Sequence, residues 1–254
     1  MSWAELFTDA YVVGFMLLFF RFAALFISIP IFSHQAIPLS LRSAMALFFA
    51  IFFYSSMPAL TFEVTFPSVI IAILGEILLG VAVGVVLQLA FNVITFAGGI
   101  ISFMMGFSMA SAIDPQSGVS MPIISQFLSL LALMVMFSVD LHHWILLFVD
   151  GSLKAVPLGG FMVNENFYHY LLNATANMFV VGFMIAFPIT ALSLLADIIF
   201  GMLMKTMPQF NLLVIGFPIK IIVSFVVLMA TLSATMLILK LQMGEAFNFL
   251  ESFF

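Results

Sequence analysis

Long apolar stretches with very few charges are the feature that most restricts the fold of this chain. About 20 helical residues cross the hydrocarbon core of a bilayer, because each adds ~1.5 Å toward a thickness of ~30 Å. Apolar runs of this order lie at Val12–Ile31, Ser43–Leu60, Ser68–Phe91, Ile123–Val149, Ala174–Phe200 and Leu212–Leu239. We therefore predict an all-α, polytopic membrane protein with about six hydrophobic helices, packed into a larger helical assembly.

A further run, Val93–Ile113, is apolar but rich in glycine and serine. It could span the membrane, re-enter it or pack inside protein, and we count it as one extra apolar helical hairpin element. No soluble segment or repeat separates the runs, so residues 1–254 are predicted to form a single domain. The first ten residues, MSWAELFTDA, lack the basic region of a signal peptide, so we interpret the first run as a retained helix.

Composition supports a membrane protein and excludes other classes. Charged residues make up 7% of the chain, against about 25% in soluble domains. Six Lys and Arg residues form no phosphate-binding face, so we expect no nucleic-acid partner. The absence of cysteine excludes disulfides, thiolate chemistry and cysteine-ligated metals.

Four charged residues lie inside the apolar runs: Arg21, Glu76, Asp197 and Lys220. Charges within membrane helices face protein or water rather than lipid. Two interpretations remain open, an ion or proton path and structural pairing, such as Arg21 with Glu76. Pairing is favoured, because a proton relay usually brings several carboxylates together and these are scattered along the chain.

Two rows of small residues repeat every four positions, and each row forms a ridge that lets another backbone approach closely. The rows are Ala72, Glu76, Gly80, Gly84 and Gly98, Ser102, Gly106, Ala110. We expect dense helix packing at Gly80, Gly84, Gly98 and Ser102, within the chain or against partners.

Phenylalanine and methionine are concentrated just before Asp114-Pro115, at Phe103, Met104, Met105, Phe107 and Met109. Methionine is flexible and fills irregular gaps. The cluster could be a deformable seal in a pore, although packed core is the favoured interpretation from the residues alone.

Enzymatic signals are weak. Asp140, His142 and His143 resemble a metal cluster, but adjacent histidines on a helix point ~100° apart. Gly106-Phe107-Ser108 is a short match to the nucleophile of an intramembrane serine protease, and no histidine partner can be assigned to it. We therefore predict no enzyme activity, no cofactor and no metal.

A set of motifs spread over nearly the whole chain resembles the FliR family of type III secretion export-gate subunits. The motifs are Arg21-Phe22-Ala23-Ala24-Leu25-Phe26, Pro30-Ile31-Phe32, Met105-Gly106-Phe107-Ser108-Met109-Ala110, Asp114-Pro115, Asp140-Leu141-His142-His143-Trp144 and Met207-Pro208-Gln209-Phe210-Asn211. Their order and spacing carry the resemblance.

The resemblance implies a core subunit of the flagellar export gate in the bacterial inner membrane, at the flagellar basal body. It implies FliP-like, FliQ-like and FlhB-like partners, and passage of unfolded flagellar proteins. It also implies that the segment before the Asp-Pro turn is a pore plug, which raises the seal interpretation above packed core. We call this segment the gasket: Phe103, Met104, Met105, Gly106, Phe107, Ser108, Met109, Ala110, Asp114 and Pro115.

Two alternatives stay open. One is the homologous subunit of a virulence injectisome. The other, from a different class, is a stand-alone secondary transporter that uses the four intramembrane charges as an ion path. Transporters often have two inverted halves with interrupted helices, and the halves of this chain show no convincing symmetry.

Overall fold

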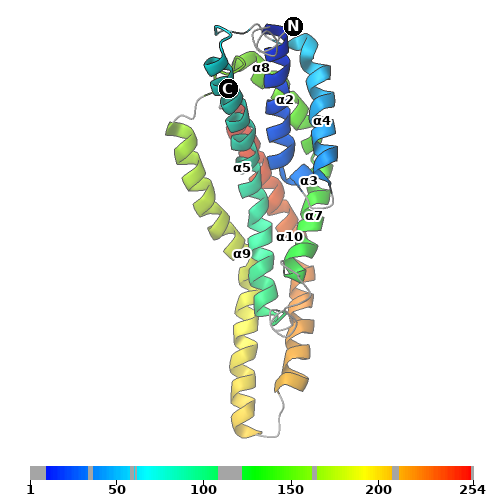
Figure 1. Ribbon diagram of the computed structural model, residues 1–254. Helices are drawn as coiled ribbons and strands as arrows, with labels where there is room; N and C mark the ends of the chain where they lie inside the picture. The colour runs from blue at the N-terminus through cyan, green and yellow to red at the C-terminus, as the bar shows by residue number, and fades with distance from the viewer. Residues whose placement is uncertain are drawn as a thin grey trace. The chain divides into compact units, whose positions relative to one another are not determined.

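The computed structural model describes residues 10–33, 37–57, 60, 62–107, 122–161, 165–207 and 212–252, and their regular structure is helical (Figure 1). The α-helices are α2 (Ala10–Ser28), α3 (Pro30–Ser33), α4 (Leu39–Phe53), α5 (Phe66–Met104), α7 (Ile123–Ser138), α8 (Leu141–Ala155), α9 (Glu165–Thr206) and α10 (Phe217–Ser252). A 3-10 turn, η1 (Tyr54–Ser56), follows α4, and a π-helical turn, η3 (Leu212–Gly216), precedes α10. The predicted all-α class is confirmed.

Four of the described helices are long and apolar enough to cross a membrane: Ala10–Ser28, Phe66–Met104, Glu165–Thr206 and Val214–Ser252. α7 and α8 make a fifth if they count as one broken span. This polytopic pattern confirms the prediction, with slightly fewer spans than six. α4 covers only part of the predicted run Ser43–Leu60. Its 15 residues form a helix about 22 Å long.

Two predicted boundaries were wrong. Ser68–Phe91 and Val93–Ile113 were treated as separate elements, but α5 is one helix of 39 residues through Asn92 to Met104. A single asparagine neither removes a backbone donor nor clashes with the preceding turn, so it does not break a helix as proline does. Conversely, Ile123–Val149 is split, because Asp140 adopts the left-handed conformation with φ of 57°.

The described residues divide into two compact units. The first unit takes its residues from Met1–Leu89, Met136–Ala174 and Met243–Phe254, and the second from Ala90–Val135 and Thr175–Gln242. The single-domain prediction is not tested by this division and stays a prediction.

The first unit has an aromatic core between α2 and α4. Phe22 and Phe26 of α2 meet Phe49 and Phe53 of α4, with ring centroids 5.4–5.8 Å apart. Aromatic pairs at such distances contribute about 0.5–1.5 kcal/mol beyond the area that they bury.

The small-residue row of α5 lies against α2 in the same unit. A Cβ on Gly80 would lie 2.5 Å from Ala24 Cβ and 2.9 Å from the amide nitrogen of Leu25. The hydroxyl of Ser28 donates a 3.0 Å hydrogen bond to the carbonyl of Gly80. One turn further along α5, a Cβ on Gly84 would lie 2.1 Å from Ser28 Oγ. The two backbones approach because glycine leaves no side chain between them.

In the second unit, α5 continues with the same kind of contact. A Cβ on Gly98 would lie 2.5 Å from Ser125 Cα of α7, and Ser125 Oγ donates a 2.8 Å hydrogen bond to Thr95 O. On α9, a Cβ on Gly182 would lie 2.7 Å from the ring of Phe96. α5 therefore packs closely against both neighbours.

These contacts predict opposite effects for two glycine-to-alanine changes in α5. Gly80→Ala should destabilise the chain by about 1–3 kcal/mol, because the new methyl group overlaps α2. Gly99 has nothing within 4 Å of its Cβ position, so Gly99→Ala should be neutral or stabilising by up to about 1 kcal/mol. Thermal unfolding of both variants in detergent measures the difference, and equal unfolding temperatures would contradict the packing.

Candidate functional site

Arg21 of α2 and Glu76 of α5 form an ion pair at the centre of the first unit. Both side chains are completely buried. The guanidinium donates from Nε to Oε2 and from Nη2 to Oε1, the second bond measuring 3.0 Å, so the contact is bidentate. This is the pairing that the sequence favoured for these two charges.

The pair is held by further groups from the chain after α7. Ser152 of α8 accepts a 3.2 Å hydrogen bond from Arg21 Nη1, and the amide of Gly159 donates a 2.6 Å hydrogen bond to Glu76 Oε1. Gly159 has φ of +77° and packs on Ala72, where a Cβ would lie 2.6 Å from Ala72 Cβ. Buried ion pairs persist where such extra hydrogen bonds satisfy the remaining donors and acceptors.

Sequence reasoning missed Ser152 and Gly159. The sequence Pro157-Leu158-Gly159-Gly160 is typical of a turn, and its glycine pair was the available signal for a backbone that approaches another group. Nothing in the sequence pattern indicated that the group would be Glu76.

Lys220 and Asp197 form a second pair, within the second unit. Lys220 Nζ lies 2.8 Å from both carboxylate oxygens of Asp197. Lys220 is buried, but the side chain of Asp197 is 54% exposed in this chain, so its expected burial within the chain is not observed. The four intramembrane charges thus form two local pairs, one in each unit.

The first half of the gasket is the capped end of α5. The amide of Gly106 bonds to Phe103 O at 3.0 Å, and the amide of Phe107 bonds to Ser102 O at 3.1 Å. Gly106 has φ of +88°, so the three features form a Schellman cap. Glycine at this position avoids the steric cost that other residues have at positive φ.

Neighbouring helices of the second unit hold this cap. Ser193 of α9 donates a 2.9 Å hydrogen bond to Met104 O, a carbonyl that the end of the helix leaves without an intrahelical partner. Met105 is fully buried, Phe107 contacts Phe225 of α10 edge to face at 6.3 Å, and Phe103 is 62% exposed. Ser108, Met109, Ala110, Asp114 and Pro115, the rest of the gasket, lie outside the described residues.

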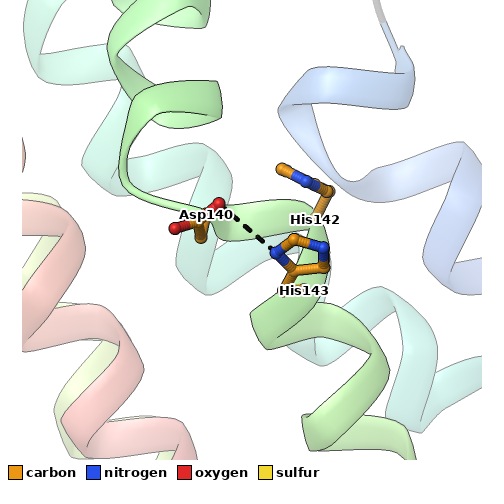
Figure 2. A group of neighbouring side chains, drawn as sticks. All are labelled: Asp140, His142 and His143. Carbon is orange, nitrogen blue, oxygen red and sulfur yellow. Dashed lines mark ion pairs between the residues drawn. The ribbon is translucent and has the colours of Figure 1, made fainter.

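Asp140, His142 and His143 lie together at the start of α8 (Figure 2). One potential ligand atom from each lies within 4.8 Å of the other two. The two imidazole centroids are 4.1 Å apart, so the ~100° divergence of adjacent helical positions does not keep these side chains apart. That part of the sequence reasoning was wrong.

Comparison with known proteins gives consistent matches. A profile described as "Bacterial export proteins, family 1" matches residues 12–246. The flagellar biosynthetic protein FliR of Bacillus subtilis is 32% identical over 89% of each chain, and that of Escherichia coli is 30% identical over 91% of this chain and 88% of the relative. The protein of the same name from Aquifex aeolicus is 23% identical over 97% of this chain and 95% of the relative.

The buried pair predicts strong coupling between its two residues. Glu76→Gln or Arg21→Met alone should cost about 3–5 kcal/mol, because each leaves a buried group without its partner. The double variant should cost less than the sum of the two. Thermal unfolding of the three variants in detergent measures the coupling energy.

The exposed pair Asp150–Lys154 of α8 is the matched control, with a 2.6 Å contact between side chains that are 41% and 75% exposed. Asp150→Asn should cost less than about 1 kcal/mol. A loss for Glu76→Gln as small as that for Asp150→Asn would show that the buried pair does not hold α2 to α5.

Proposed function

The chain belongs to bacterial export protein family 1, and from that membership we propose that it is a core subunit of the flagellar type III protein export gate. It is a membrane-embedded component of the flagellar export apparatus, and the proposed location is the bacterial inner membrane at the basal body. The flagellar names of its relatives favour this system over a virulence injectisome.

The capped end of α5 is the observation that carries the proposed role of the gasket. The Schellman cap and the Ser193 bond fix the point from which the gasket continues. Met105 anchors the cap in the second unit, while Phe103 presents its ring outward. A fixed anchor followed by a segment that contains the flexible side chain of Met109 suits a seal that excludes ions and yields to an unfolded chain.

Exposed apolar surface supports the proposed partners. Only 33% of the most apolar window of Glu165–Thr206 and 17% of that of Val214–Ser252 is buried within this chain. Helix interfaces in membranes form by close packing of such surfaces. FliP-like, FliQ-like and FlhB-like subunits would cover them in the proposed gate.

The proposed function involves no bond chemistry and no ion-coupled transport of a small solute. Arg21 and Glu76 are locked by Ser152 and Gly159, whereas a proton path needs groups that exchange protons with neighbours. The proposed role of the chain is therefore to seal the export channel against ions and to open for an unfolded protein.

The first test of this role concerns stable partners. Co-expressed with FliP-like and FliQ-like subunits, the chain should co-purify with them, and expressed alone it should aggregate or degrade because α9 and α10 stay uncovered. Size-exclusion chromatography and mass spectrometry of the complex measure this. A monodisperse monomer that moves a small solute across liposomes would overturn the gate proposal.

The second test concerns the gasket. Phe107→Gly combined with Met109→Gly should raise ion leakage in cells that carry the complete gate, without changing the yield of the complex. The control is Phe48→Gly, because it removes a phenylalanine that is 63% exposed on α4 of the first unit and leaves the gasket unchanged. Leakage that is equal in the two strains would mean that these gasket residues do not form the seal.

A further inference from the structure

We propose that Asp140, His142 and His143 bind one divalent transition-metal ion, for which Zn²⁺ is the natural probe. The three residues occupy the interruption between α7 and α8 and the first turn of α8. They belong to the first unit, and the proposed export function uses none of them. The site is independent of that function.

Distances between the side chains fit a shared ion. His143 Nδ1 and Asp140 Oδ1 are 3.3 Å apart. Two ligands at Zn²⁺ bond lengths and a tetrahedral angle are about 3.4 Å apart. The ligand atom of His142 lies within 4.8 Å of both, so binding one ion requires the imidazole of His142 to move toward the other two ligands.

His142 supplies an independent observation. Its Nδ1 is buried and has no hydrogen-bond partner among the described residues. A buried nitrogen without a partner costs free energy, and a ligand that approaches it removes the cost. The ring is oriented by Phe137 of α7, whose centroid lies 5.8 Å away.

The choice of residue at position 140 points the same way. Its left-handed backbone, with φ of 57°, would be satisfied by glycine or asparagine. Aspartate makes no side-chain capping bond to α8, and its carboxylate instead faces His143 (Figure 2). Asp140 therefore both forms the left-handed turn and supplies a carboxylate that can bind a metal ion.

Donor chemistry selects the class of metal. Two imidazole nitrogens and one carboxylate oxygen suit Zn²⁺, Ni²⁺ or Co²⁺, whereas Mg²⁺ and Ca²⁺ prefer oxygen ligands alone. Three protein ligands leave at least one position for water or a further donor. Asp140 and His143 are exposed, so an ion reaches the site from solvent. A bound ion would fix the left-handed turn to the first turn of α8.

The experiment uses the full chain in its complex with partner subunits, purified in detergent with a tag that contains no histidine. After dialysis against low-micromolar zinc chloride, elemental analysis should find one zinc per chain. Co²⁺ should give visible absorption bands from a site with nitrogen ligands, a measurement that needs no variant. No retained zinc, or no change in the Co²⁺ spectrum on adding protein, would overturn the proposal.

Variants locate the ion. Asp140→Asn keeps a residue tolerated at positive φ, and His143→Gln keeps a polar side chain, so both should retain the fold and lose at least about tenfold in Zn²⁺ affinity. The control is His169→Gln, which removes another exposed histidine paired with a carboxylate, Glu165 at 3.6 Å. An equal loss in the control, or unchanged affinity in Asp140→Asn and His143→Gln, would reject the site.

Discussion

The bidentate contact between Arg21 and Glu76 is the constraint on which the first unit depends. A fully buried guanidinium is expensive unless its charge and donors are satisfied, and here a carboxylate, a hydroxyl and a nearby carbonyl satisfy them. Satisfying them fixes α2 and α5 in register, so that Gly80 and Gly84 meet Ala24 and Ser28. The same carboxylate accepts from Gly159, which ties the turn after α8 to both helices. One ion pair thus joins three parts of the sequence.

Rigid and adaptable parts of the chain are separated along α5. Its first part is held by the ion pair and by glycine contacts, and its end is held by the Gly106 cap and the Ser193 hydroxyl. Met104 and Met105 belong to this capped end, and Met109 follows it in the sequence. In the proposed gate, this arrangement confines deformation to the part of the gasket after Phe107, because the helix before it cannot shift without breaking buried polar contacts.

The helical class, the long apolar runs and the Arg21–Glu76 pairing could be predicted from sequence, because the cost of exposing charge or backbone to lipid leaves few alternatives. The continuity of α5 and the interruption at Asp140 could not, because hydropathy measures polarity and these boundaries depend on backbone conformation. Ser152 and Gly159 were missed for a related reason. Neither changes the hydropathy pattern, and both contact the ion pair only because the tertiary fold brings α8 and the turn after it next to Arg21 and Glu76. The clustering of His142 with His143 depended on side-chain rotamers, which helical periodicity does not specify.

The separation of Arg21 and Glu76 by 55 residues has a consequence for synthesis of the chain. At about 5–20 residues per second, a ribosome needs roughly 3–11 s to deliver the carboxylate after the arginine. During that interval Arg21 of α2 has no carboxylate partner from Glu76. A ribosome that stalls before Glu76 therefore leaves Arg21 in an apolar helix without the carboxylate that pairs with it in the finished chain.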